Sequence, residues 1–329
     1  HDALPILIVF YTFAGGFLAV CWTDFIQGVM MFLAIAAVPL FAIMLTGGFS
    51  TSFTAMQTLD PNVFNPFVKP DNTRMGFIET ISLLGWGLGY FGQPHILVRF
   101  MAVKASSELT RATHIAMTWV VISLCASVLV GMAGKIYLTE PLSGSATETV
   151  FLVMSNNIFS PFVAGLILSA VLAAIMSTAS SQLLVAASAF SQDFYKTIIH
   201  KTTNQKELVW VSRASVMTIA VIAVLLGMNP DNLILDMVAY AWAGFGASFG
   251  PALLAALFWR RTTSRGVIAG IVVGGITVIV WKQFAFLGLY EIIPGFIFSL
   301  LAVYIVSILD KSPSKEVTDV FDSVKHSNI

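Results

Sequence analysis

The chain has 329 residues, of which 57% are hydrophobic and only 10% are charged. Soluble domains carry about 25% charged residues, so this composition excludes an ordinary soluble domain and indicates a polytopic membrane protein. The formal net charge is zero, which gives no bulk attraction to nucleic acid, and we expect no nucleic-acid partner.

Apolar stretches of membrane length recur along the chain and predict an all-α bundle of membrane helices with about nine spans. The first span is short, and the fifth is longer than a bilayer requires, so the fifth should tilt or extend into the cytoplasm. In chain order the predicted spans are Leu4–Ala19, Ile26–Leu45, Gly76–Gly92, Ile115–Tyr137, Phe159–Phe190, Val209–Met228, Leu233–Phe258, Gly266–Trp281 and Ile292–Leu309.

The basic residues predict how the chain is oriented. Most Lys and Arg residues lie in one alternate set of connections, of which Arg260, Arg261 and Arg265 are an example. The positive-inside rule places this set in the cytoplasm, with the N-terminus outside and the C-terminus inside. Residues 1–309 are therefore predicted to form the transmembrane core and residues 310–329 a short cytoplasmic tail.

Asp24 lies between the first two predicted spans. We interpret it as a solvated aspartate in a cytoplasmic turn. A role in gating or in a cation path is the alternative, because an ionisable residue at membrane depth is costly and usually functional.

The third predicted span is interrupted between Gly85 and Pro94, where four glycines and a proline fall within one segment. Each interior Gly costs a helix about 1 kcal/mol relative to Ala, and Pro costs about 3, so this helix should loosen. Loosened backbone at membrane depth is tolerated only where it is buried in protein or lines a wet cavity. Such an interruption is typical of the substrate site of a transporter.

Trp86 and Tyr90 lie four residues apart in this segment. On residual helix they would face the same way and form an aromatic wall for the apolar part of a small amino acid. Opened backbone amides nearby could hold its carboxylate. An interfacial aromatic belt is the alternative, but the two residues do not lie at a clear edge of the span.

The fifth span carries hydroxyl groups on one helix face, at Ala174, Ser177, Thr178 and Ser181. Neutral hydroxyl and carbonyl oxygens suit a weakly held monovalent cation such as sodium, whereas tight calcium or magnesium sites use carboxylates. The residues alone equally allow close helix packing, or hydroxyls bonded back to the preceding turn.

Two later spans are rich in small residues at a spacing of four. In the seventh span, Gly246 and Gly250 predict close packing or a hinge rather than direct ligand contact. In the eighth span, packing explains Gly266, Gly270 and Gly274.

Four segments carry a family resemblance. Residues 85–95 look like the seventh-helix signature of the sodium/proline symporters, and residues 173–178 resemble their ninth-helix sodium motif. Residues 240–246 and 291–296 are similar to later stretches of the same proteins. The resemblance covers essentially the whole chain and points to the sodium:solute symporter family, which has a LeuT-type inverted-repeat fold.

This resemblance implies that the predicted spans match the family's helices five to thirteen, with the N-terminal helices absent from this chain. It implies half of a sodium site at Ala174, Ser177 and Thr178, and part of a proline site and its hinge at Trp86, Tyr90 and Pro94. The two groups of residues are expected to meet at a small hydrated chamber midway through the bilayer.

The implied function is sodium-coupled uptake of L-proline by alternating access across the plasma membrane, here a bacterial inner membrane. The implied partners are the sodium ion, L-proline or a similar small solute, and the lipid bilayer. We expect no enzymatic activity. A sodium symporter for another solute, or a transporter-like sensor module, is the alternative, although the short tail argues against a sensor.

Overall fold

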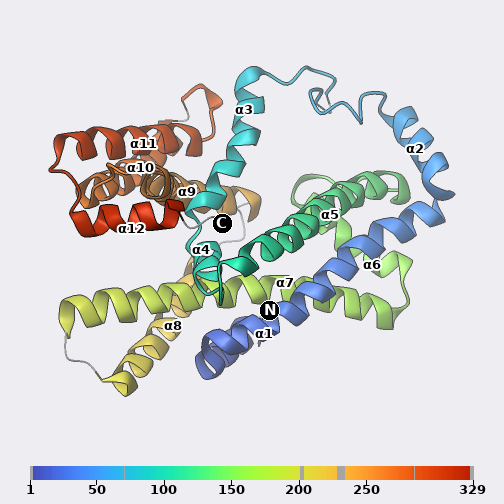
Figure 1. The fold of residues 1–329 in the computed structure, drawn as a ribbon. Coiled ribbons are helices and arrows are strands. Elements are labelled where there is room, and N and C mark those ends of the chain that lie inside the picture. The colour runs from blue at the N-terminus through green and yellow to red at the C-terminus, as the bar shows by residue number, and fades with distance from the viewer. Residues whose placement is uncertain (1–2, 70, 201–203, 228–233, 285, 327–329) are drawn as a thin grey trace. The chain divides into compact units, whose positions relative to one another are not determined.

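The computed structural model describes residues 3–69, 71–200, 204–227, 234–284 and 286–326 (Figure 1). Within these residues the structure is built from helices, and the only β pairing is an isolated bridge between Val68 and Arg74. The all-α prediction is confirmed. The chain forms two compact units, His1–Asn65 with Thr110–Pro230 and Pro66–Leu109 with Asp231–Ile329, and each is described by itself.

Long α-helices joined by short helical turns make up the first unit. Its elements are α1 (Ala3–Leu45), α2 (Gly48–Leu59), α5 (Ser107–Tyr137), η2 (Gly144–Thr149), α6 (Val150–Ile158), α7 (Pro161–Ser188), η3 (Ala189–Ile199) and α8 (Gln205–Gly227). The helix of the fifth predicted span is longer than a bilayer requires, because α7 continues into the π-helix η3, and its extension into the cytoplasm stays a prediction.

Helix α1 has its break at Gly16, not at Asp24. Gly16 has φ 61° and ψ −160°, a conformation that residues with a Cβ rarely adopt. Between Phe17 and Gln27 the sequence has neither Gly nor Pro, and the Thr23 hydroxyl donates to the carbonyls of Ala19 and Val20. The helix therefore continues through Asp24, and the predicted turn at this residue is wrong.

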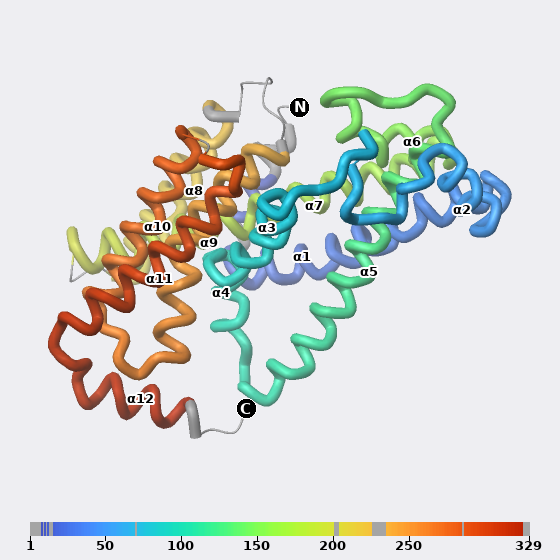
Figure 2. Tube along the Cα trace, turned by 90° about the horizontal axis from the view of Figure 1, so that it is seen from above, coloured from blue at the N-terminus to red at the C-terminus, as the bar shows by residue number. Residues whose placement is uncertain are grey.

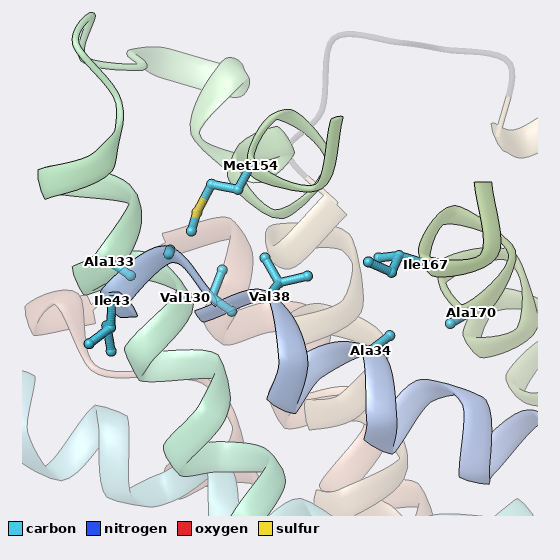
Figure 3. Close-up of a cluster of buried hydrophobic side chains, with 9 residues drawn as sticks. Ala34, Val38, Ile43, Val130, Ala133, Met154, Ile167 and Ala170 are labelled. Carbon is cyan, nitrogen blue, oxygen red and sulfur yellow. The ribbon is translucent and has the colours of Figure 1, made fainter. Parts of the chain in front are cut away.

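The core of the first unit lies where α1 crosses α5, α6 and α7 (Figure 3). Val38 of α1 is fully buried, and Met154 of α6 is also inaccessible. Small side chains such as Ala34, Ala133 and Ala170 let the helices approach closely. Ile167 and Ala170 of α7 belong to this core, and further along α7 the Ser181 hydroxyl reaches Asp24 of α1.

The second unit combines an interrupted helix with a three-helix bundle. Its elements are α3 (Phe77–Gly85), η1 (Trp86–Gly92), α4 (Pro94–Met101), α9 (Ile234–Phe258), α10 (Ser264–Phe284), η4 (Phe286–Gly288), α11 (Ile292–Leu309) and α12 (Lys315–His326). Figure 2 shows α10 and α11 running side by side.

Glycines on α10 let this helix approach both α11 and α9 closely. A methyl group added at Gly266 would overlap Ser307 of α11, and one at Gly274 would overlap the backbone of Ala247 in α9. The packing interpretation of the eighth predicted span is therefore confirmed. Gly246 and Gly250 of α9 likewise face Gly89 and Phe296, so the packing interpretation holds for the seventh span too.

Seven helices in the described residues are long and apolar enough to cross a membrane. They are Gly16–Leu45, Ser107–Tyr137, Pro161–Ile199, Gln205–Leu225, Leu235–Phe258, Ser264–Phe284 and Ile292–Leu309. The first and third predicted spans have no counterpart of this length, because one is cut at Gly16 and the other is interrupted after Gly85. The count of nine spans stays a prediction.

Candidate functional site

The interrupted helix of the second unit begins with α3 and loses its α-helical pattern after Gly85. Residues Trp86–Gly92 form the tighter 3₁₀ helix η1, and Gln93 is extended, with φ −80° and ψ 111°. Helix α4 then starts at Pro94, a position where the missing N–H of proline is not needed. The predicted loosening of this span is confirmed, and the break lies where the sequence places it.

Two side chains donate hydrogen bonds to backbone carbonyls at the break. The indole Nε1 of Trp242, on α9, donates to the Trp86 carbonyl at 3.0 Å. The Gln93 amide nitrogen donates to the Gly89 carbonyl and to the Trp242 carbonyl, both at 3.2 Å. Gln93 is only 3% exposed, so these bonds lie in a dry environment, where an unpaired carbonyl would be costly.

Helix α9 reaches η1 because both elements carry glycine at the contact. A methyl group on Gly89 would overlap the Trp242 ring. One on Gly246 would lie 2.6 Å from the Gly89 Cα, and one on Gly92 would overlap the Phe245 carbonyl. The glycines of this segment therefore do two things, since they loosen the helix and also admit a neighbouring helix and its indole ring.

Aromatic rings gather beside the break. Trp86 stacks on Trp242 with 5.4 Å between ring centroids and 14° between ring planes. Tyr90 meets the same Trp242 edge-on, at 4.8 Å and 84°. On its other side the cluster continues to Tyr290, whose ring lies 6.5 Å from that of Trp86.

The aromatic wall is thus assembled differently from the pattern we predicted. A 3₁₀ helix has three residues per turn, so residues four apart point about 120° away from each other. The rings of Trp86 and Tyr90 are joined through Trp242, which the predicted wall did not include. Tyr90 is 47% exposed and Pro94 is half-buried at the start of α4.

Tyr290 is anchored at both its backbone and its side chain. Its backbone N–H donates to the Ser82 hydroxyl at 3.0 Å, and its phenol donates to the Ala239 carbonyl at 2.7 Å. Burial raises the pKa of Tyr290, with the nearby Glu291 carboxylate as the second cause. The phenol therefore stays protonated and keeps its role as a donor.

On α7, in the first unit, the predicted sodium residues lie on one helix face. The hydroxyls of Ser177 and Thr178 both donate to the Ala174 carbonyl, at 3.0 and 3.1 Å. This is the back-bonded arrangement that the packing alternative describes. Each hydroxyl uses its hydrogen in this way, so its oxygen lone pairs remain available to a cation.

Asp24 brings a carboxylate to this face, a contact with α7 that the sequence did not predict, although it left a cation-path role for Asp24 open. The Ser181 hydroxyl lies 3.1 Å from Oδ2 of Asp24 and 2.7 Å from the Ser177 carbonyl. Ser180 and Ser181 are buried, whereas Thr178 is exposed. A carboxylate beside neutral oxygen ligands strengthens the attraction for a cation. The sequence did contain a signal for this position of Asp24, because the residues around it include neither Gly nor Pro and favour a continuous helix.

The sequence is similar to those of known bacterial transporters. The chain is 46% identical over 311 residues to the sodium/proline symporter of Escherichia coli K12, covering 93% of this chain and 61% of that protein. It is 46% identical over 318 residues to the high-affinity proline transporter PutP of Bacillus subtilis 168, with 96% and 66% coverage. The chain thus spans about three fifths of the length of the first of these relatives.

The fold also matches a solved structure. A sodium-coupled sialic acid symporter, in a substrate-bound outward-open state, superposes with a TM-score of 0.72 over 95% of this chain and 66% of its own, at 19% identity. This similarity concerns the fold alone, and it confirms the prediction of a LeuT-type transporter fold. The model of the sodium:solute symporter family matches residues 3–274. The chain therefore belongs to the sodium:solute symporter family, a family of multi-pass membrane transporters.

Proposed function

We propose that the protein carrying this chain takes up L-proline together with sodium, by alternating access, across the plasma membrane of a bacterium. The observation that carries this proposal is 46% identity, over more than nine tenths of the chain, to proteins named sodium/proline symporter and proline transporter. The C-terminal tail would lie in the cytoplasm, which the distribution of Lys and Arg supports.

Sodium would bind at the α7 face, with the Ala174 carbonyl and the hydroxyl oxygens of Ser177 and Thr178 as ligands. Both hydroxyls now point their hydrogens at the Ala174 carbonyl. Rotation of the two O–H bonds away from that carbonyl would leave its lone pairs, with those of the two hydroxyl oxygens, available to one ion. Asp24, linked to this face through Ser181, would add the negative charge of one carboxylate beside these neutral oxygens.

Proline would bind beside the break in the second unit. Its ring is apolar and small, which suits the exposed face of Tyr90 and the edge of Trp86. Its carboxylate and secondary amine need hydrogen bonds that an interrupted helix can supply from backbone groups. Pro94, at the first position of α4, would act as the hinge.

The energy for uptake would come from the sodium gradient and the membrane potential. One charge crossing the membrane releases about 2.3 kcal/mol per 100 mV. That energy suffices to concentrate a solute about fiftyfold, since each 1.4 kcal/mol is a factor of ten. Alternation between outward and inward states would couple the two fluxes.

The proposal is tested with the protein expressed from its full coding sequence and reconstituted in liposomes. Labelled proline should accumulate only under an inward sodium gradient, and an ionophore that collapses the gradient should abolish accumulation. Replacing sodium by choline, lithium or protons identifies the coupling ion. Proline uptake that is equally fast in choline would reject sodium coupling, and preference for another solute would reject the substrate assignment.

A further inference from the structure

We propose that Trp242 is a positioning residue, which holds η1 in its 3₁₀ conformation and thereby sets the orientation of Trp86 and Tyr90. This inference deepens the proposed function, and its effect on proline binding rests on that function. Neither the aromatic wall nor the break in the helix, as predicted from the sequence, includes a residue of α9.

The argument begins with the backbone of η1. A 3₁₀ segment bonds each carbonyl to the N–H three residues on, with poorer geometry than an α-helix, so donors from outside the segment can strengthen it. Trp242 supplies one partner directly, through the bond from its Nε1 to the Trp86 carbonyl at 3.0 Å. Through its own carbonyl it also fixes Gln93, whose amide caps the Gly89 carbonyl.

The same indole contacts both rings of the candidate proline site. Trp86 lies parallel to it and Tyr90 lies perpendicular to it, so the two rings cannot turn independently of Trp242. Stacked and edge-on aromatic pairs are more favourable than the apolar area that they bury accounts for. Trp242 therefore couples the conformation of the backbone to the orientation of the side chains.

Steric fit makes this arrangement specific. Gly89 lies directly beneath the Trp242 ring, where any side chain would overlap it. A methyl group added at Gly87 would meet no atom within 4 Å, so the absence of a side chain is required at Gly89 and not throughout η1. The contact is therefore a fitted one, built from a glycine on one element and an indole on the other.

The test uses Trp242→Phe, which keeps an aromatic ring but removes the indole N–H. We expect the proline KM to rise about threefold to tenfold with a smaller change in Vmax, because the loss of one hydrogen bond of about 1 kcal/mol is a factor of about five. Gln93→Met removes the second pair of bonds at similar volume and should act in the same direction. Trp259→Phe is the matched control, since Trp259 follows α9 and stacks on Tyr304 instead.

Amide hydrogen exchange supplies a measurement that is independent of transport. In the Trp242→Phe protein, exchange should quicken in peptides covering residues 85–93 and stay unchanged in peptides from α10 and α11. Unchanged exchange at residues 85–93 in both variants, or a lowered Vmax with unaltered KM, would overturn the inference. If the unsubstituted protein transports no proline, the proposed function fails, and exchange still decides whether Trp242 holds η1.

Discussion

The hydroxyl groups of Ser177 and Thr178 can each interact with two partners, the Ala174 carbonyl and a bound cation. Each hydrogen is donated to the Ala174 carbonyl, and the oxygen lone pairs remain free to bind an ion. An ordinary packing serine makes the first bond and never the second. The two roles therefore differ in what happens when the oxygen is removed.

We predict that the double variant Ser177→Ala, Thr178→Ala raises the sodium concentration needed for half-maximal proline uptake by at least about tenfold, because two proposed ligand oxygens worth about 1 kcal/mol each would be lost. Sodium-dependent uptake kinetics in proteoliposomes measure the effect. Ser169→Ala is the control, since Ser169 lies on the same helix and donates back to the Gly165 carbonyl on an exposed face.

An unaltered sodium dependence in the double variant would reject the assignment of these residues. Asp24→Asn offers a second measure, because it keeps an oxygen opposite Ser181 but removes the charge. Asp24→Asn should also raise the sodium concentration needed for half-maximal proline uptake.

In the aromatic cluster, the residues with a local sequence signal could be predicted, and the residue that joins them through a long-range contact could not. Trp86 and Tyr90 could be chosen because they lie within a glycine-rich break, which is a local signal. Trp242 lies 156 residues from Trp86, and nothing in its own neighbourhood indicates which carbonyl it reaches. Asp24 was misassigned for a related reason, because a charge among apolar residues suggests a turn unless its partner on α7 is known.

At the scale of elements, the contact between η1 and α9 depends on glycines that approach backbone to backbone. We predict that Gly246→Ala destabilises the protein by about 1–3 kcal/mol, because its new methyl group would meet the Gly89 Cα at 2.6 Å. Gly244→Ala is the matched control, as nothing lies within 4 Å of its added methyl group and Ala favours a helix by about 1 kcal/mol.

Thermal unfolding of both variants in the same detergent measures this difference. The midpoint should fall for Gly246→Ala and stay level or rise for Gly244→Ala. Equal midpoints would mean that α9 and η1 separate easily, contrary to the close contacts between their backbones.

The start of α10 and the end of α11 are joined by polar contacts. The Arg261 guanidinium donates to the carbonyls of Ile308 and Asp310, the last groups of α11, and Arg265 pairs with the Asp310 carboxylate at 3.2 Å. The backbone N–H of Lys311, together with Thr263 and these guanidinium groups, lowers the pKa of Asp310.

The lowered pKa of Asp310 predicts a pH dependence. Because the folded pKa lies below the unfolded value of about 4, the ionised carboxylate contributes its full stability above that pH and loses it as the pH falls through the folded pKa. Asp310→Asn should therefore lower the unfolding midpoint at pH 7, and its difference from the unsubstituted protein should shrink below about pH 4. A difference that is the same at both pH values would exclude this contribution.

Helix boundaries could be predicted wherever the backbone chemistry of the residues decides them. Gly85 and Pro94 mark the ends of η1 because glycine and proline act locally. The break in α1 lies at Gly16 instead, next to Gly15, inside a stretch whose hydropathy predicts an uninterrupted span. Hydropathy measures only whether a segment prefers lipid, so it cannot locate a change of backbone conformation within an apolar run.

At the scale of the whole molecule, the number of crossings decides where each loop lies. After the connection that follows α2, six membrane-length helices remain, namely α5, α7 with η3, α8, α9, α10 and α11. Six crossings alone would return the tail to the side on which that connection lies. The interrupted helix α3–η1–α4 must also cross if the tail is to lie on the opposite side.

We predict that it does cross, since the connection between Gly47 and Met75 is poor in basic residues while the loops around Arg260 and Lys311 are rich in them. Single cysteines at Gln57 and Ser312, introduced after Cys21 and Cys125 are replaced by serine, report the two sides. A membrane-impermeant maleimide should label Gln57→Cys in intact cells and Ser312→Cys only in inverted vesicles. Labelling of both from one side would mean that the interrupted helix enters and leaves the bilayer at the same face. The break would then face one compartment throughout, and a site there could not alternate between the two.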